Sequence, residues 1–504
     1  MKACLFLQRK FAPIGNKIAG YLKQYGINEF CAVTTPRTAY NFLVSQKEVP
    51  YSKIILDEDI HKKYKDEKLD WDYLNQLEKE YGLPNLWPYL YIDRVLMNGQ
   101  LIREYPHNNP LLSGEDLLKT LQITSKEIIK FLKEEKPDFL FISVIGSLTS
   151  LLLYSICQKM GIKTLNLDYT RMGNGIVLSD DYKTFSGAYK IFEDIQSGKI
   201  ANPKEKQAKK FLEEFQAKPT AYVTESGAFA PRPTARLKQL KFLLPKQLIK
   251  NLRWFLKWCW QSAFKKDFDY TDERPLWSLI DKIKRKFREM RGFSDLYEKP
   301  DFSENFAFFP LHLEPEIATM LYAPFFTDQI SLIRQIARSL PIGLKLYVKE
   351  HPSMLGYRTR NYYKEIIKIP NVKLIDPSYS SFDLISKAKI TFAISGTAGW
   401  ETALLKKPVI TFGDVFYNKL SAVKKSDSPE KLPFLVKEQL EKFHYNDKEV
   451  INFISAIMAD SIDADLVLMW ESEDQKENIE KNQGLKDLAG LIAKKLNLAN
   501  GTEK

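Results

Sequence analysis

The chain has 504 residues and a mass of 58.5 kDa, a length that predicts about three domains, or two larger ones with an insertion. Hydrophobic residues make up 44% and charged residues 27%, which excludes wholesale disorder and predicts a packed α/β protein. The formal net charge is +12. Four scattered cysteines and five scattered histidines form no CxxC, HExxH or HxH motif, which excludes the usual sulfur-rich and histidine-built metal sites.

The amino-terminal apolar stretch runs only from Ala3 to Leu7 before polar residues interrupt it. This stretch is too short for the core of a signal peptide. The sequence also lacks a run of about 18 apolar residues, so we expect no membrane-spanning helix. These features predict a cytoplasmic protein with reduced cysteines.

Strands and helices alternate in the first 170 residues at spacings that predict a parallel sheet. The predicted strands are Ala3–Leu7, Phe30–Val33, Ile54–Asp57, Phe139–Ser143 and Lys163–Leu167. The predicted helices are Asn16–Tyr25, Ser113–Lys136 and one that ends near Met160, with a helical insertion around residues 60–112. We expect residues 1–230 to form a Rossmann-like domain.

Most of the excess positive charge lies in residues 231–300. The run from Arg236 to Lys266 contains nine basic residues and no acidic one. Apolar residues recur there at helical spacing, with a break expected near Pro245, and they include three tryptophans within seven residues. These residues are Leu237, Leu240, Leu244, Leu248, Leu252, Phe255, Trp254, Trp258 and Trp260.

Three interpretations fit this basic, tryptophan-rich segment. A helix with a basic face, an apolar stripe and tryptophans is typical of a segment that lies in the headgroup region of an anionic leaflet. A helical hairpin packed on the domains, with a solvated basic face, gives the same pattern. Nucleic-acid binding is the least favoured, because the chain has no RNA-binding signature, zinc finger or long basic tail.

A second alternation begins near residue 301. The predicted strands are Phe306–Leu311, Leu344–Val348, Val372–Ile375, Lys389–Ile394 and Val409–Phe412. The predicted helices are Thr327–Ser339, Tyr362–Lys368, Ser381–Ser386 and Gly399–Leu405. We expect a second Rossmann-like domain at 301–470 and a charged tail at 471–504 with a late helix, Leu485–Leu496. Two such halves predict a cleft that binds ligands at the carboxyl ends of the strands.

The strongest candidate for phosphate binding is the turn Ser395-Gly396-Thr397, which follows an apolar strand and opens a helix. Glycine permits close approach of an anion, hydroxyls donate hydrogen bonds, and a helix N-terminus offers free N–H groups. Glu401, about one turn into the helix, is a candidate for bonding ribose hydroxyls. The alternatives are an ordinary capped helix and a glutamate that complements the helix dipole.

Further candidates stand at other strand ends. His351, in Glu350-His351-Pro352, could donate to a departing phosphate or act as a general acid, or could be a surface residue without function. Glu316 belongs to a stretch with two glutamates and a histidine in five residues, and could serve acid–base chemistry or only begin a helix. Asp168 is a candidate base and Arg171 a candidate anion ligand.

The run from about Phe306 to Tyr417 resembles the capsule polysaccharide biosynthesis family of bacterial glycosyltransferases, which includes transferases for the acidic sugar Kdo. The resemblance rests on "FFPLHLEPE", "LYVKEHP", "IPNVKLI", "SFDLI" and "SGTAGWETALLKKPVITFGDVFY", with a weaker match at "TRMGN". It implies a GT-B fold of two Rossmann-like domains facing a cleft, here with a helical basic insertion at 231–300. It also implies that His351, Ser395 and Thr397 contact the donor phosphate and that Glu401 lies near the ribose.

The sequence therefore predicts a nucleotide-sugar-dependent glycosyltransferase at the inner face of the cytoplasmic membrane. The predicted partners are a nucleotide-sugar donor, a polysaccharide or lipid-linked acceptor and an anionic membrane surface, with no nucleic acid. No Asp-x-Asp stands at a strand end, so no metal or other cofactor is expected; Asp463 and Asp465 form that pattern only late in the chain. The rivals are a nucleotide-sugar epimerase on the same fold and a non-enzymatic module that binds polysaccharide or export machinery.

Overall fold

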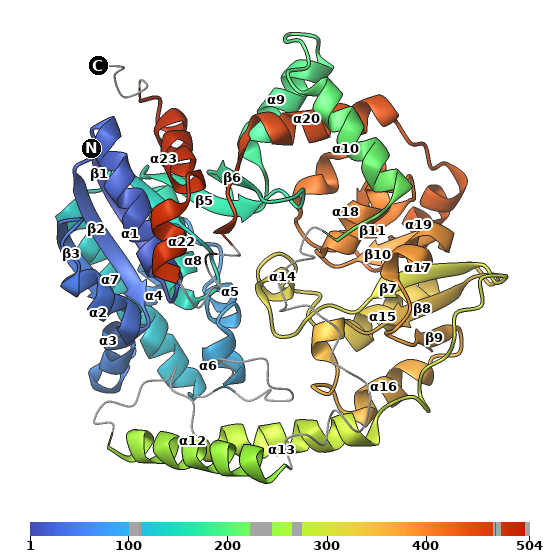
Figure 1. Ribbon diagram of the computed structural model, residues 1–504, viewed down its shortest axis with the longest axis horizontal. Helices are drawn as coiled ribbons and strands as arrows, with labels where there is room; N and C mark the ends of the chain where they lie inside the picture. The colour runs from blue at the N-terminus through green and yellow to red at the C-terminus, as the bar shows by residue number, and fades with distance from the viewer. Residues whose placement is uncertain are drawn as a thin grey trace.

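The computed structural model describes residues 1–99, 110, 112–221, 244–264, 275–466, 469 and 475–498. It contains a seven-stranded and a six-stranded sheet, each flanked by helices, which lie side by side in Figure 1. We call the two units the N-terminal half and the C-terminal half. A pair of helices runs along one edge of both (Figure 1).

The N-terminal sheet has a core of five parallel strands in the order β3-β2-β1-β4-β5. These strands are β1 (Lys2–Gln8), β2 (Glu29–Thr35), β3 (Tyr51–Leu56), β4 (Phe139–Ile142) and β5 (Lys163–Tyr169). Two antiparallel pairings extend this core, first β6 (Gly175–Ser179) on β5 and then β13 (Ser461–Asp463) on β6. The central strands are buried and continuously apolar, as expected for parallel strands covered by helices on both faces.

Helices α1, α2, α7 and α8 connect these parallel strands, and short helices fill the predicted insertion. The connecting helices are α1 (Phe11–Leu22), α2 (Arg37–Ser45), α7 (Gly114–Glu135) and α8 (Leu148–Lys159). The insertion contains α3 (Asp57–His61), α4 (Trp71–Tyr81), α5 (Trp87–Tyr91) and α6 (Arg94–Asn98), and residues 100–109 and 111 lie outside the described part. Leucines and tyrosines of α4 and α5 are buried against α7 and α8, which explains the aromatic composition of the insertion.

The C-terminal sheet is parallel throughout, in the order β12-β11-β10-β7-β8-β9. Its strands are β7 (Phe306–Pro310), β8 (Lys345–Lys349), β9 (Val372–Ile375), β10 (Ile390–Ala393), β11 (Val409–Thr411) and β12 (Val423–Lys425). Its helices are α14 (Ile317–Met320), α15 (Gln329–Ser339), α16 (Arg360–Ile367), α17 (Ser381–Lys387), α18 (Thr397–Leu404) and α19 (Leu432–Glu441). The strand order reverses between β7 and β10, where ligands bind in open α/β sheets. Two Rossmann-like units, as predicted, are therefore confirmed.

Two segments of the chain cross from one half of the molecule to the other. Helices α9 (Ser186–Gln196) and α10 (Glu205–Ala217) pack against α20 (Asp447–Ala459) in an aromatic-rich core that includes Trp400 of the C-terminal half. Conversely, β13, α22 (Gln475–Lys481) and α23 (Gly484–Lys495) return to the N-terminal half. The domain boundaries drawn from the sequence stay a prediction, and they do not describe these crossings.

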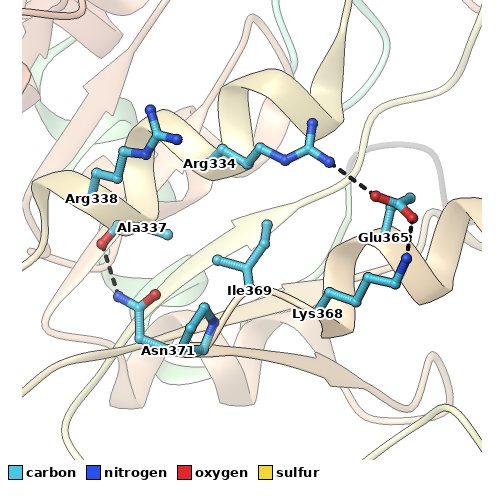
Figure 2. Close-up of a pocket in the computed structure, with 8 residues that line it drawn as sticks. Arg334, Ala337, Arg338, Glu365, Lys368, Ile369 and Asn371 are labelled. Atoms are coloured by element: carbon cyan, nitrogen blue, oxygen red, sulfur yellow. Dashed lines mark hydrogen bonds and ion pairs between the residues drawn. The ribbon is translucent and has the colours of Figure 1, made fainter.

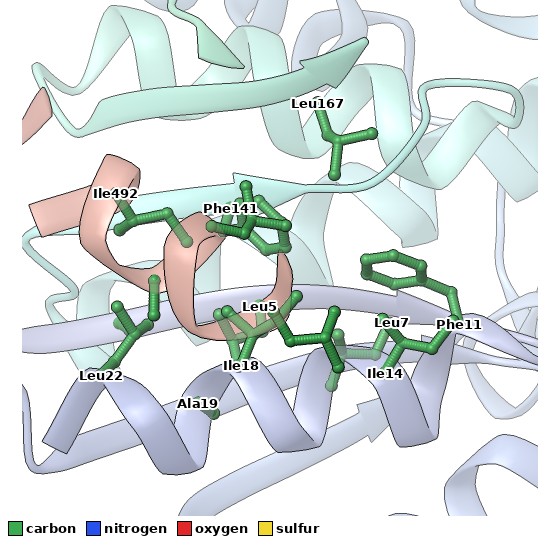
Figure 3. Packing of buried hydrophobic residues seen from close by; sticks show 14 of the residues in the cluster. Leu5, Leu7, Phe11, Ile14, Ile18, Ala19, Leu22, Phe141, Leu167 and Ile492 are labelled. Carbon is green, nitrogen blue, oxygen red and sulfur yellow. The ribbon is translucent and has the colours of Figure 1, made fainter. Parts of the chain in front are cut away.

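The returning helix α23 completes the N-terminal core. Leu485, Leu488 and Ile492 recur at helical spacing and are fully buried against α1 and the sheet. Figure 3 shows Ile492 beside Phe141 of β4, with Leu22 of α1 below it. The late helix predicted in the charged tail thus packs in the core of the N-terminal half.

Helices α12 (Pro245–Ala263) and α13 (Pro275–Arg291), which we call the basic hairpin, form the edge seen at the bottom of Figure 1. Each starts at a proline, a favoured first residue of a helix, so Pro245 begins α12 where the sequence predicted a break. The predicted helical character of the basic insertion is confirmed for these two segments, while residues 231–243 and 265–274 lie outside the described part. None of the described helices is long and apolar enough to span a membrane.

The basic hairpin is attached mainly through the last turns of α13. Arg288 donates a 2.6 Å hydrogen bond to the carbonyl oxygen of Tyr357, and the guanidinium of Arg285 lies 4.6 Å from the centre of the Tyr357 ring. On α12, by contrast, no residue is buried. The two helices touch where Lys282 of α13 lies 4.9 Å from the ring of Trp254.

Candidate functional site

A small cavity lies where the two halves meet, and we call it the interdomain cavity. Its lining comes from both halves: Asp168, Arg171, Tyr182, Lys183, Phe185, Tyr322, Ser395, Gly396, Thr397, Asp414, Val415, Phe416 and Tyr417. Asp168 ends β5 and Ser395 follows β10, so the carboxyl ends of both sheets reach this cavity, as expected for the predicted GT-B-like arrangement. The structure thus brings together five predicted site residues: Asp168, Arg171, Ser395, Gly396 and Thr397.

The cavity has a volume of about 30 Å³. Pockets that hold nucleotide-sized ligands usually measure about 300–1,000 Å³. Three contacts flank it: an ion pair of 3.0 Å between Lys183 and Asp414, the stacked rings of Phe185 and Phe416 at 4.4 Å, and a hydrogen bond from the Tyr189 hydroxyl to Phe416. The last two belong to the core that α9 shares with the C-terminal half. At this volume the cleft is closed to a nucleotide-sized ligand.

The Ser395–Thr397 turn is held by hydrogen bonds on several sides. The Ser395 hydroxyl donates to the carbonyl oxygen of Ala318, so it ties the turn to α14 and does not cap α18. The Tyr417 hydroxyl donates 2.6 Å to the carbonyl oxygen of Gly396. Within the described chain, the backbone N–H groups of Thr397 and Ala398 have no hydrogen-bond acceptor, as is usual for the first turn of a helix.

His312 is the residue of this site that sequence reasoning did not select. It follows β7, and its Nε2 accepts hydrogen bonds from the backbone nitrogens of Gly396 at 3.1 Å and Ser395 at 3.4 Å. The sequence placed His312 in a strand-end motif, but only the pairing of β7 with β10 brings it beside the turn. A side chain on Gly396 would place Cβ 2.8 Å from that Nε2, which explains the glycine.

A buried ionic network lies behind His312. Arg358 is fully buried and pairs with Glu350, which follows β8, and at 3.1 Å with Glu314, which follows β7. Burial raises the pKa of Glu314, while Arg358 opposes this shift. Glu350 also accepts a 2.7 Å hydrogen bond from the Tyr363 hydroxyl. The network fixes the loops after two neighbouring strands of the C-terminal sheet relative to each other.

His351 and Glu316 do not line the interdomain cavity. His351 stands directly after Glu350, and its Nδ1 accepts a 3.2 Å hydrogen bond from the backbone nitrogen of Ser353. It is close enough to His312 for its charge to lower the pKa of that residue. Glu316 is the N-cap residue of α14, and its side chain makes no capping hydrogen bond there.

Glu401 lies in the second half of α18 and also outside the cavity lining. Glu401 is not in the first turn of α18, so the alternative that it only complements the helix dipole is not supported. Burial raises its pKa to about 7, which the charge of Lys349 opposes. Burial lowers the pKa of Lys349 to about 8, and this lysine donates 2.8 Å to the Ser381 hydroxyl. The two groups therefore titrate close to neutral pH.

Asp168 and Arg171 form an ion pair of 2.8 Å on the β5–β6 hairpin. Arg171 has a positive φ of 61° in the turn and also donates 2.6 Å to the carbonyl oxygen of Tyr169. Both side chains remain partly exposed to the cavity. A carboxylate and a guanidinium consequently face the Ser395–Thr397 turn across the two halves.

Two other hollows are remote from this cleft. One, of about 320 Å³, lies between α15 and α16, and Figure 2 shows Glu365 between Arg334 and Lys368 at its rim. The other, of about 410 Å³, lies between α4 and α7. In the described residues, no group of three or more His, Cys, Asp or Glu side chains is placed to hold a metal ion.

Comparison with known proteins identifies a segment that contains most of this site. Residues 288–425 match the model of the family described as capsule polysaccharide biosynthesis protein. Protein FixF of Sinorhizobium fredii is 30% identical over 125 residues, which are 23% of this chain and 29% of FixF. The matched region thus spans less than a third of that relative.

Solved structures give weaker likenesses. KpsC of Thermosulfurimonas dismutans, a beta Kdo 2,7 transferase, is 11% identical with a TM-score of 0.36, covering 74% of this chain and 89% of that chain. A UDP-GlcNAc 2-epimerase of Neisseria meningitidis is 12% identical with a TM-score of 0.24, covering 91% and 98%. At such scores neither likeness bears on function. The family match confirms the resemblance found in the sequence: residues 288–425 are similar to the capsule polysaccharide biosynthesis family.

Proposed function

We propose that the protein is a glycosyltransferase that moves a sugar from a nucleotide-sugar donor to a surface-polysaccharide or lipid-linked acceptor. The observation that carries this proposal is the coincidence of the family segment with a cavity lined by the carboxyl ends of both sheets. The C-terminal half supplies a helix N-terminus suited to a phosphate, and the N-terminal half supplies a carboxylate and a guanidinium. A donor and an acceptor would meet between them.

The donor phosphate would bind to the N–H groups of Thr397 and Ala398 and to the Thr397 hydroxyl. Negative charge grows on this phosphate as the sugar leaves, and donors placed there in advance lower the barrier. His351 is proposed as a further donor to the phosphate and Glu401 as the partner of the ribose hydroxyls. Because the interdomain cavity holds only about 30 Å³, the halves must separate for the donor to enter.

The acceptor hydroxyl would approach from the N-terminal half. Asp168 is the proposed base, because it lines the cavity opposite the Ser395–Thr397 turn and Arg171 fixes its position. Arg171 could also pair with an acidic group of the sugar or with the phosphate. Glu316 remains a second proposed acid–base residue, although it is outside the cavity lining in the closed state.

We further propose that the basic hairpin docks the enzyme on the anionic inner face of the cytoplasmic membrane. Its exposed large apolar residues are Leu248, Ile249, Leu252, Trp254, Leu256 and Trp260 on α12, with Leu276, Trp277, Ile280, Ile283 and Phe287 on α13. α12 contains no acidic residue, and its Lys250, Arg253 and Lys257 are exposed. Unpartnered apolar surface next to uncompensated positive charge fits a lipid surface with negative headgroups.

The first test is a thermal-shift screen of the purified protein against CMP, UDP, GDP and their sugars. A nucleotide present at 100 times its dissociation constant stabilises the folded state by about 2.7 kcal/mol. Transfer to a lipid-linked acceptor is then followed with the nucleotide sugar that binds. Conversion of the donor sugar without any acceptor would instead identify the epimerase, and binding of no nucleotide would favour a non-enzymatic module.

A further inference from the structure

His312 is fixed in position by its own backbone. Its N–H donates 2.7 Å to Oε1 of Gln329, and its carbonyl oxygen accepts from Nε2 of Gln329 at 3.1 Å and from Arg358 at 2.7 Å. Gln329 and Arg358 are both buried. Both polar backbone atoms of His312 are therefore hydrogen-bonded to buried side chains, and these bonds fix the position of the imidazole.

The imidazole can act as an acceptor only while it is neutral. Burial, followed by the charges of His351 and Arg358, lowers the pKa of His312 to about 3, so the ring is neutral at neutral pH. In the tautomer with the proton on Nδ1, the free lone pair of Nε2 faces the N–H groups of Ser395 and Gly396. Since this lone pair takes both N–H groups, they cannot also bind a phosphate without displacing His312.

The next two N–H groups along the chain, those of Thr397 and Ala398, are the ones without an acceptor among the described residues. Gly396, which precedes them, is held through both of its polar backbone atoms, because His312 accepts from its nitrogen and Tyr417 donates to its carbonyl oxygen. Glycine is required in this clamp, since the nearest atom to an added Cβ would be Nε2 of His312. The direction of the first turn of α18 is set by this clamp.

We infer that His312 is a positioning residue for the donor phosphate: it holds the Ser395–Gly396 backbone so that the N–H groups of Thr397 and Ala398 face the phosphate. This inference rests on the proposed function. His312 itself does not touch the donor, and Tyr417 assists it from the opposite side of the peptide. The ligand recognised at these N–H groups is the phosphate of a nucleotide, whatever its base.

The test compares nucleotide and nucleoside binding in two variants of the full chain. His312→Phe keeps a ring but removes the acceptor, and His312→Gln offers an oxygen at a similar distance from the backbone. Affinity is measured by calorimetry for the nucleotide among CMP, UDP and GDP that binds the native protein, and for its nucleoside. His444→Phe, at an exposed histidine, is the matched control.

We expect His312→Phe to weaken nucleotide binding about tenfold or more, the effect of losing one hydrogen bond that orders the site. Binding of the nucleoside, which has no phosphate, should be unchanged, and His312→Gln should restore most of the nucleotide affinity. In a donor titration the loss should appear in KM more than in kcat. Tyr417→Phe, which removes only the second hydrogen bond of the clamp, should give the same selective loss if His312→Phe does not fold.

Two results would overturn the inference while leaving the proposed function intact. One is an unchanged nucleotide affinity in both His312→Phe and Tyr417→Phe. The other is an equal loss for nucleotide and nucleoside, which would mean that the whole pocket is distorted. Failure of the native protein to bind any of the three nucleotides would overturn the proposed function itself, and the two failures are thus distinguishable.

Discussion

The ammonium nitrogen of Lys183 lies 3.0 Å from a carboxylate oxygen of Asp414, and this pair joins the two halves at the edge of the interdomain cavity. Both side chains are about a third or more exposed, so water screens the pair strongly. Exposed pairs of this kind contribute about 0–1 kcal/mol. The neighbouring stacked rings of Phe185 and Phe416 are buried and contribute more to stability.

The stability of the folded state should therefore depend on the aromatic contact and little on the ion pair. We expect Lys183→Gln to change the free energy of unfolding by less than about 1 kcal/mol. Phe185→Ala should cost about 3–5 kcal/mol, the usual loss for a buried phenylalanine. Urea unfolding measures both. An equal effect of the two substitutions would contradict this assignment.

Gly396→Ala should disturb the clamp around the Ser395–Thr397 turn. The new Cβ would lie 2.8 Å from Nε2 of His312, so the imidazole or the turn must shift, at a cost of about 1–3 kcal/mol. Nucleotide affinity should fall with stability. Gly343→Ala is the control, because nothing lies within 4 Å of a Cβ there, and its effect should stay within about 0.5 kcal/mol.

His351→Ala should reduce transfer about a hundredfold, the effect of removing one hydrogen-bond donor to developing negative charge. The fold should persist, because His351 is only partly buried and lies in a loop after β8. Steady-state transfer and circular dichroism provide the two measurements, with His444→Ala as the exposed control. Turnover near the native rate would assign His351 to loop structure alone.

The partly buried carboxyl of Glu401 predicts a pH-dependent stability. Its pKa is raised from 4.5 to about 7, so its contribution is fully present below pH 4.5 and is lost as the pH rises through 7. Glu401→Gln removes the ionisation, so the variant should gain stability relative to the native protein between pH 4.5 and 8, by up to about 3 kcal/mol. Urea unfolding across this range would refute the assignment if the difference between the two proteins stays constant.

Membrane binding of the basic hairpin predicts flotation with anionic but not with neutral vesicles. Electrostatic attraction should weaken at high salt, since the Debye length falls from about 10 Å at 0.1 M to about 3 Å at 1 M. Replacing Lys250, Arg253 and Lys257 with glutamate should abolish flotation without unfolding the protein. The control variant replaces the exposed Lys206, Lys209 and Lys210 of α10 with glutamate. If the hairpin variant floats with anionic vesicles to the same extent as the native protein, docking through the basic residues of α12 is excluded.

The sheets could be predicted because their signal is local. Strands such as β9 and β10 are short apolar runs bounded by turns, and their carboxyl ends carry the motifs that were read from the sequence. The strand β6 was missed because it belongs to an antiparallel hairpin whose turn contains Gly173 and is not part of the alternation. The return of α23 was missed for a different reason, because a helix pattern gives its apolar face but not its partner.

The site was predictable only in part. The Ser395–Thr397 turn has a recognisable order of glycine, hydroxyls and helix start. His312, in contrast, is separated from Gly396 by 84 residues, and its role depends on the adjacency of β7 and β10 in the sheet. The role of Arg358 could not be predicted for the same reason, because the sequence around a single arginine in a loop does not indicate that it is fully buried between two glutamates.

The contacts of α13 determine which half of the molecule would keep a fixed orientation if the basic hairpin bound a membrane surface. Arg360 pairs with Asp295 and donates to the carbonyl oxygen of Gly292, just beyond α13, and Arg288 holds Tyr357. These contacts tie the basic hairpin to the C-terminal half through the loop after His351. On a bilayer, this half would be the fixed frame of reference. When the cleft opens, the N-terminal half, which carries Asp168 and any bound acceptor, would then rotate relative to a stationary Ser395–Thr397 turn.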